Sequence, residues 1–368
     1  MIDLFTLDPV SLTAALVDVP SVSHEERPLA DMLERALRSI PGVEVLRHEN
    51  SLVARTQRGL PQRVVLAGHI DTVPIAENVP CVRGVNDQGE DTLFGCGTVD
   101  MKSGLAVYLA VFARLANDPA LAYDLTLVCY EGEEVAARFN GLGLIHGAHP
   151  DWLLGDVALL GEPSGAIIEA GCQGSIRLRV TAHGVRAHSA RSWLGKNAMH
   201  ALAPVISSIA AYEAQEVLVD GCRYHEGLNI VHCESGVATN TIPDEAWLFV
   251  NFRFAPNRTQ EEALAHMLAV LDLPEGMEYE IDDIVPGARP GLDLPVVRRL
   301  IAATGGQVRA KYGWTDVARF SELGIPAVNF GPGDPAYCHK RDEQCPTWMI
   351  TSVFDTLMTY LQAGETNE

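Results

Sequence analysis

Five short segments carry histidine or carboxylate residues where strands are expected to end or helices to begin. They are 68–71 (GHID), 97–104 (GTVDMKSG), 131–134 (EGEE), 161–164 (GEPS) and 331–339 (GPGDPAYCH). Imidazole and carboxylate groups bind divalent metal ions, and in paired-metal sites one carboxylate can bridge both ions. Two histidines and three carboxylates from these segments would form such a site. One further glutamate would then be left for acid/base chemistry.

Each segment also has a simpler interpretation when it is taken alone. His69 would be a core histidine, Asp100 a helix cap, and the carboxylates of 131–134 a solvated acidic turn. With 12 histidines in the chain, about 0.7 His-x-Asp pairs are expected by chance, and the pair at 149–151 is interpreted as one of these. The five segments together are more informative than any one of them, because four of the five follow expected strands or open helices, where α/β folds bind ligands.

The composition argues against several other classes of protein. Apolar residues make up 47% of the chain and charged residues 20%, which excludes intrinsic disorder. The net charge of −21 disfavours binding to nucleic acid or to anionic membranes. The GxSxG, GxxxxGK[ST] and GxGxxG patterns are absent from the sequence. Their absence argues against serine hydrolases, P-loop enzymes and nicotinamide dehydrogenases.

The cysteines and the N-terminal residues bear on the compartment. The 8 cysteines form no CxxC pair, and a chain of this length builds its core without disulfides, so we expect reduced thiols. The first ten residues lack a basic segment of the secretory type, and no apolar run reaches membrane-spanning length. The expectation is a cytoplasmic protein.

The elements that must position these residues alternate between strands and helices, which predicts an α/β fold on a largely parallel or mixed sheet. A helix is expected to begin at Asp8-Pro9, and a second, over 29–40, to follow a capping box formed by Ser23 and Glu26. Further helices are expected over 104–115 and 348–362, and strands over 43–46, 52–55, 63–67, 125–130 and 157–160.

The pattern changes near residue 176, where apolar and polar residues begin to alternate as in a strand with one wet face. The order from there is strand, helix (197–213), strand, strand, helix, strand, which is typical of a small α+β domain. The second of these helices is expected to begin with a capping box formed by Thr259 and Glu262. A Gly- and Pro-rich linker lies near residue 286. We therefore predict a discontinuous catalytic α/β domain, 1–175 and 288–368, with an inserted ferredoxin-like α+β domain over 176–287.

The motifs GHIDTVP, GTVDMKSG, EGEE and GEPS, with the late His339, resemble the M20 metallopeptidase family of co-catalytic zinc aminoacylases and carboxypeptidases. The resemblance covers essentially the whole chain. It implies two Zn²⁺ ions per subunit, with Co²⁺ as a possible replacement at one site. His69 and Glu162 would bind one ion, and Glu134 and His339 the other. Asp100 would bridge the two.

The same resemblance assigns roles to residues around the metal ions. Asp71 would orient His69, Glu133 would be the general base, and the peptide bond after Asp100 would be cis. The inserted domain would be a dimerisation, or lid, domain, whose His188 reaches the partner's site in a homodimer and stabilises the oxyanion. Substrate contacts would come from Asn240, Arg253, Thr315 and Arg319. Arg191 or Arg186 would replace basic residues absent at 172–173.

The resemblance implies hydrolysis of an amide bond in a small N-acyl amino acid. The stretches AGCQGSIRLRV, RAHSARSWLGKNA and KYGWTDVARF resemble one branch of the family, and this resemblance implies N-succinyl-LL-2,6-diaminopimelate as the substrate, in the supply of diaminopimelate and lysine. The alternative is deacetylation of acetylornithine, or cleavage of another N-acyl or peptide substrate. Two other interpretations are a non-catalytic relative that binds metal or proteins, and a plain α/β protein whose acidic loops are surface. No nucleic-acid or membrane partner is expected.

Overall fold

The computed structural model describes residues 8–362, which fall into two compact units. The first contains the chain up to Ala170, then Pro290–Arg309, and the chain from Thr315 onward. The second contains Gly171–Arg289 and Ala310–Trp314. The sequence-based boundaries at 176 and 287 differ from these by a few residues.

The segment Ala310–Trp314 differs from the expectation, which placed it in the catalytic domain. Its grouping with the second unit has a local cause. The indole N–H of Trp314 donates a hydrogen bond to the carbonyl of Pro286 (3.2 Å), and the ring of Tyr312 packs edge-on against His225. Both partners lie in the second unit.

The first unit is built on a mixed eight-stranded sheet in the order β1-β2-β6-β3-β7-β18-β8-β17. Its strands are β1 Glu44–His48, β2 Ser51–Arg55, β3 Arg63–His69, β6 Asp124–Tyr130, β7 Val157–Leu160, β8 Ile168–Ala170, β17 Val308–Ala310 and β18 Ala327–Asn329. β3 pairs in parallel with both β6 and β7, and β7 with β18, so four adjacent strands run in the same direction. The predicted α/β fold class is confirmed.

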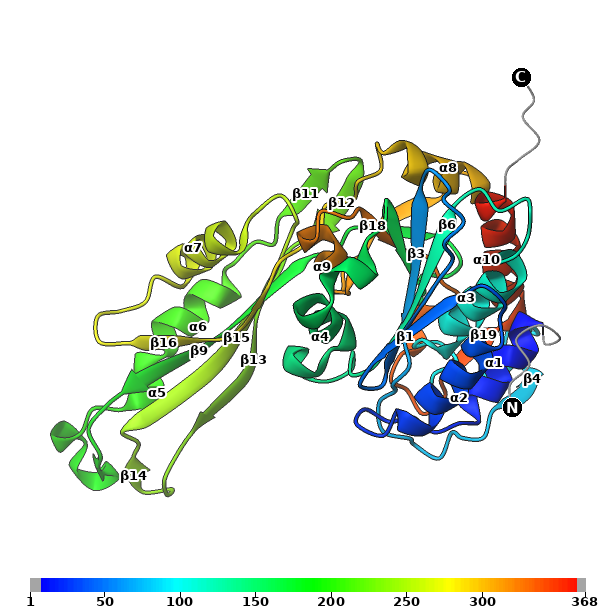
Figure 1. Cartoon of the computed structure of the whole chain (residues 1–368). Helices are drawn as coiled ribbons and strands as arrows, with labels where there is room; N and C mark the ends of the chain where they lie inside the picture. Colours follow the sequence, from blue (N-terminus) through cyan, green and yellow to red (C-terminus); the bar gives the residue numbers. More distant parts are fainter. Residues whose placement is uncertain (1–7, 363–368) are drawn as a thin grey trace. The chain divides into compact units, whose positions relative to one another are not determined.

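Helices cover both faces of this sheet. They are α1 Pro9–Val17, α2 Arg27–Arg38, α3 Lys102–Leu115, α4 Gly141–Ala148, α8 Pro295–Ala303, α9 Val317–Glu322 and α10 Thr347–Leu361. α3 and α10 lie on one side of the sheet and α4 and α9 on the other (Figure 1). A smaller sheet combines β4 Val82–Val85, β5 Asp91–Phe94 and β19 Gln344–Pro346. Within residues 8–362 no helix is long and apolar enough to cross a membrane.

Two expectations for helix starts have opposite outcomes. Asp8 caps α1 as predicted, since its carboxylate accepts the backbone N–H groups of Val10 and Ser11. The capping box ahead of α2 is wrong. The Ser23 hydroxyl instead donates to Asp71 Oδ2 (2.7 Å), and Glu26 accepts the N–H of His24. The carboxylate of Asp71, which is distant in the sequence, thus takes the hydroxyl that was expected to cap α2.

The second unit has the predicted strand and helix order. Its antiparallel sheet runs β13-β15-β9-β16. The bounds are β9 Gly174–His183, α5 Ala198–Ala201, α6 Ala203–Ala210, β13 Gly227–Ser235, β15 Glu245–Phe254, α7 Gln260–Leu271 and β16 Glu278–Val285. The single helix predicted over 197–213 is divided into α5 and α6, because Pro204 lacks an N–H to continue the helical ladder. Short pairs β10 Ala187–His188 with β14 Thr241–Ile242, and β11 Glu216–Val219 with β12 Cys222–His225, complete the unit.

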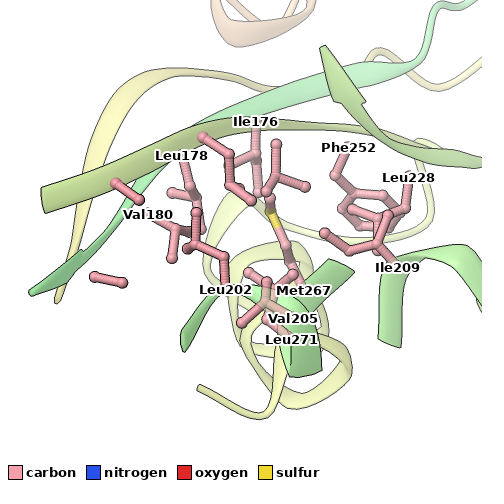
Figure 2. Packing of buried hydrophobic residues seen from close by; sticks show 14 of the residues in the cluster. Ile176, Leu178, Val180, Leu202, Val205, Ile209, Leu228, Phe252, Met267 and Leu271 are labelled. Atoms are coloured by element: carbon pink, nitrogen blue, oxygen red, sulfur yellow. The ribbon is translucent and has the colours of Figure 1, made fainter. Parts of the chain in front are cut away.

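One face of this sheet packs against helices. Ile176, Leu178 and Val180 alternate along β9 and point toward Val205 and Met267 from the helices (Figure 2). The residues between them on β9 lie on the opposite, open face of the sheet. The expected alternation of apolar and polar residues is therefore present, and it leaves one sheet face available for contacts.

Candidate metal centre

The four adjacent parallel strands of the first unit end at one edge of the sheet, and a candidate residue lies at or after each end. β3 ends at His69 itself. Glu133 and Glu134 follow β6, Glu162 follows β7, and His339 lies in the loop after β18. The carboxyl ends of parallel strands are where α/β sheets form ligand sites. The topology thus gathers residues that are far apart in the sequence.

Asp100 lies at the centre of this cluster and belongs to two groups of ligand atoms. One group is His69, Asp100 and Glu162, and the other is Asp100, Glu134 and His339; within each, the atoms lie within 4.8 Å of one another. Asp100 Oδ1 is 3.1 Å from His69 Nε2, and Oδ2 is 3.4 Å from His339 Nε2. Each oxygen of Asp100 therefore faces a different histidine, as a bridging carboxylate requires.

The charges in the cluster are strongly coupled. Burial opposes ionisation of both His69 and Asp100, but the hydrogen bonds and opposite charges around them outweigh it. Hydrogen bonds with Asp100 and Asp71 raise the pKa of His69, and hydrogen bonds with His339 and His69 lower the pKa of Asp100. The pKa of Glu133 is raised well above its ordinary value, first by burial and then by the negative charge of Glu162. A carboxylate in this position is suited to accept a proton.

The side chains of the cluster are better satisfied by a bound metal ion than by pairing with one another. Glu134 Oε2 lies 3.1 Å from His339 Nε2. Its other oxygen, Oε1, is buried without a hydrogen-bond partner in the part of the chain that the structure describes. A buried carboxylate oxygen without a partner is costly, and a cation would supply the missing interaction. The donor set, imidazole and carboxylate, is the one that divalent transition-metal ions prefer.

Asp71 supports the cluster through the Nδ1 side of His69. Its carbonyl oxygen is 3.0 Å from His69 Nδ1, and its Oδ1 is 3.4 Å from the same nitrogen. Its carboxylate also accepts the backbone N–H groups of Glu133 (3.1 Å) and Glu134 (3.2 Å). Burial raises the pKa of Asp71, but the interactions with His69 and these donors lower it overall. Asp71 therefore stays ionised and directs Nε2 of His69 toward the cluster.

The loop that carries Asp100 is held by Glu343, a residue that the sequence analysis missed. The peptide bond between Asp100 and Met101 is cis, in agreement with the resemblance. The Glu343 carboxylate accepts the N–H groups of Gly97 (3.1 Å), Val99 (2.8 Å) and Asp100 (3.0 Å). In sequence Glu343 lies in KRDEQC, a charged stretch typical of a surface turn. No local signal distinguishes it.

A close approach of two backbones fixes the start of α3 beside Glu162. A Cβ atom placed on Gly104 would lie 1.8 Å from the carbonyl oxygen of Gly161. Only glycine fits there, because the contact is with backbone that has no freedom to move aside. Gly104 thus sets the position of the loop after β7 against the helix that follows Asp100.

Two predicted substrate residues of the first unit are engaged inside it. Thr315 is buried, and its hydroxyl donates to Asn329 Oδ1 (3.0 Å). Arg319 Nε donates to Asp316 Oδ1 (2.6 Å), and this buried carboxylate also accepts from Asn140 Nδ2 (2.9 Å). Asp316 was not singled out from the sequence. Contact of Thr315 and Arg319 with a substrate remains a prediction.

The predicted residues of the second unit lie in two separate places. His188 is exposed on β10, its Nδ1 accepts the N–H of Ala190, and Asn240 lies beside it through the hydrogen bond from Ser189 N to the Asn240 carbonyl. Arg191 is in the exposed turn that follows. Arg253 lies at the far end of β15, opposite the start of β9. The second unit therefore brings together His188, Asn240 and Arg191, but not Arg253.

Comparison with known proteins agrees with this geometry. Residues 65–363 match the model of peptidase family M20/M25/M40. The chain is 59% identical to a succinyl-diaminopimelate desuccinylase of Corynebacterium glutamicum, covering 96% of each chain. It is 52% identical to a protein of Mycobacterium tuberculosis named for the same activity, covering 96% of this chain and 98% of that one. In fold it is similar to a tripeptidase of Staphylococcus aureus, with a TM-score of 0.78 and 20% identity over 96% of each chain.

Proposed function

The chain belongs to peptidase family M20/M25/M40, and from this membership we propose that it hydrolyses N-succinyl-LL-2,6-diaminopimelate to succinate and LL-2,6-diaminopimelate. The substrate rests on the 59% identity to a protein named for that activity. The observation that carries the chemistry is the position of Asp100, whose two oxygens face His69 and His339. A biosynthetic reaction of this kind would take place in the cytoplasm.

The ligand groups support a site for two metal ions, which we propose are Zn²⁺, with Co²⁺ able to replace one. His69 and Glu162 would hold one ion, Glu134 and His339 the other, and Asp100 both. When bound, such ions polarise the amide carbonyl and lower the pKa of a water molecule toward about 7.

Glu133 would carry the proton in this reaction. Its raised pKa, caused by burial and by Glu162, suits a group that takes a proton from water and then returns it. The oxygen of the water molecule forms a bond to the succinyl carbonyl carbon, and the bond from this carbon to nitrogen breaks. The proton that Glu133 took passes to the departing amine. Glu134 lies close to three proposed ligands, His69, Asp100 and His339. It would therefore remain a ligand.

The second unit supports a homodimer as the active form. Arg253 and His188 lie toward opposite ends of its sheet, because Arg253 pairs with Ser175 at one end of β15 and the chain from Asn240 enters at the other. The stretch of β15 from Glu245 to Arg253 spans about 25 Å, too far for one small substrate to touch both in one copy. We propose that Arg253 acts on its own subunit's substrate and that His188 stabilises the oxyanion in the partner's site.

The net charge of −21 opposes the approach of an anionic substrate. We propose that arginines reverse the field locally, because a guanidinium binds a carboxylate with two hydrogen bonds. Arg253, Arg319 and Arg191 would bind substrate carboxylates, assisted by Thr315 and Asn240. Arg186 is the other candidate beside Arg191, and it pairs with Asp244 (2.8 Å) as Arg319 pairs with Asp316 (2.6 Å).

The experiment that tests the proposed function is an assay of succinate release. The purified chain is incubated with N-succinyl-LL-2,6-diaminopimelate and ZnCl₂, then dialysed against a chelator and assayed again. The proposal predicts turnover that is lost on chelation and restored by zinc. Turnover that survives complete metal removal would contradict the metal chemistry, and absence of turnover in a zinc-loaded chain would contradict the substrate.

A further inference from the structure

Glu343 connects two loops that each carry a ligand of the proposed metal site. Its side chain is 2% exposed and accepts three backbone N–H groups, from Gly97, Val99 and Asp100. Its own carbonyl oxygen accepts the N–H of Gly95 (3.0 Å). Four hydrogen bonds therefore join one residue to the short loop that ends in Asp100.

Glu343 is also connected to His339 by a short, hydrogen-bonded stretch of chain. The N–H of Glu343 donates to the carbonyl of Lys340 (3.2 Å), and the N–H of Lys340 donates to Tyr337 (3.4 Å), so the chain from 337 to 343 is a tight turn. His339 within this turn has a positive φ of 62°, a conformation that costs free energy for a residue other than glycine and needs support from its surroundings. The turn that carries His339 and the loop that carries Asp100 thus meet at Glu343.

The two proposed metal ions differ in how much they depend on this connection. His69 belongs to the buried strand β3 and is held by Asp71, so its position does not need Glu343. His339 is 51% exposed, and its turn is joined to the Asp100 loop through Glu343. Loss of Glu343 should therefore affect the group Asp100, Glu134 and His339 more than the group that contains His69.

We infer that Glu343 is a positioning residue for the metal ion held by Asp100, Glu134 and His339. It sets the separation of Asp100 and His339 by fixing the backbone of both loops, and it touches neither metal nor substrate. The inference rests on the proposed two-metal site. A carboxylate is required because two oxygens must accept three N–H groups: Oε1 accepts from Val99 and Asp100, and Oε2 from Gly97.

The test is zinc binding by Glu343→Gln, measured without substrate. In this variant an amide NH₂ replaces one acceptor oxygen and faces a backbone N–H, so at least one of the three bonds is lost. Metal-free wild type and variant are titrated with ZnCl₂ by calorimetry, and bound zinc is counted after gel filtration. The wild type should bind two ions. The variant should bind one ion with an affinity close to that of the wild type, because only Asp100 of its ligands depends on Glu343, and the other with a Kd raised by about 10- to 100-fold.

A Co²⁺ titration gives a second readout that a general loss of stability would not produce. The visible absorption of the first equivalent should match the wild type, and the second equivalent should appear only at higher Co²⁺. Activity of the variant should rise toward that of the wild type as zinc is raised, with KM little changed. Glu77→Gln is the matched control, because Glu77 contacts Arg341 in the same turn but is exposed, and it should behave as the wild type.

The outcomes separate the inference from the proposed function. A wild type that binds fewer than two zinc ions would contradict the two-metal site itself. A wild type with two sites and a Glu343→Gln variant with the same two affinities would overturn the role of Glu343 alone. A metal-free variant that fails to fold would also overturn it, because Glu343 would then be a residue of fold stability. Glu343→Asp, which keeps the charge but shortens the side chain, should give an intermediate Kd.

Discussion

Asp71 holds the imidazole of His69 by its Nδ1 edge, at 3.0 Å from the Asp71 carbonyl and 3.4 Å from its Oδ1. The same carboxylate accepts the backbone N–H groups of Glu133 and Glu134. One residue therefore orients a ligand on β3 and fixes the loop that follows β6. The cluster is preorganised by its supporting residues and not by the ligands alone.

Replacement of Asp71 by Asn should loosen this support. The amide keeps the volume but loses the negative charge, and its NH₂ group cannot accept the N–H groups from the 133–134 loop. We expect metal affinity or kcat to fall by about 10- to 100-fold, measured by zinc titration and initial rates. Ser23→Ala removes only one neutral donor to Asp71 and should have a much smaller effect. Equal effects of the two changes would contradict the orienting role.

Replacement of Glu133 by Gln should abolish turnover and keep the metal ions. The amide cannot take a proton, so kcat should fall by about 10²- to 10⁴-fold, whereas the proposed ligands remain intact. Bound zinc is counted by mass spectrometry on the same samples that are assayed. Loss of an ion from this variant would make Glu133 a ligand and remove it from the role of general base.

The partner's His188 can be tested by subunit complementation. His188→Ala and Glu133→Gln should each be nearly inactive, but a mixed dimer of the two would contain one complete site. Co-expression with random pairing should restore about one quarter of wild-type activity. The purified mixed dimer should have about half of it. If the mixture stays inactive, although mixed dimers form, His188 does not act across the subunits.

The contact between α3 and the loop after β7 gives a prediction about stability. Gly104→Ala would place a methyl group 1.8 Å from the Gly161 carbonyl oxygen, which should lower the free energy of unfolding by about 1–3 kcal/mol or more. Gly147, near the end of α4, has nothing within 4 Å of an added Cβ, so Gly147→Ala should be neutral or stabilise by up to about 1 kcal/mol. Urea denaturation of both variants checks the contrast. Similar midpoints would show that the backbone contact is not tight.

Much of the fold could be predicted because local patterns determine it. The apolar run of β3 and the 157–160 strand are buried on both faces, and short continuous runs of this kind are typical of buried parallel strands. The capping box of α7, in which Thr259 and Glu262 exchange hydrogen bonds, depends on residues three apart. Where a signal lies within a few residues of its effect, sequence reasoning succeeds.

The failures involve partners that are distant in the sequence. Ser23 has the right neighbour for a capping box, but Asp71 takes its hydroxyl. Glu343 resembles a surface residue until the fold brings three backbone N–H groups to it. Asp316, which pairs locally with Arg319, likewise acquires Asn140 as a partner only through the tertiary structure. Supporting residues of a site are therefore harder to predict than its ligands, because the residue types of the ligands, histidine and carboxylate, already indicate metal binding.

The measurement that tests the central claim most directly is a competition between two substrates. Equimolar N-succinyl-LL-2,6-diaminopimelate and N-acetylornithine are given to the zinc-loaded chain, and succinate and acetate are followed in one tube by NMR, with a chelated sample beside it. The account predicts zinc-dependent release of succinate with little acetate. Preferential release of acetate would keep the metal mechanism and contradict the substrate, and release of neither by a chain with two bound zinc ions would contradict the proposed activity.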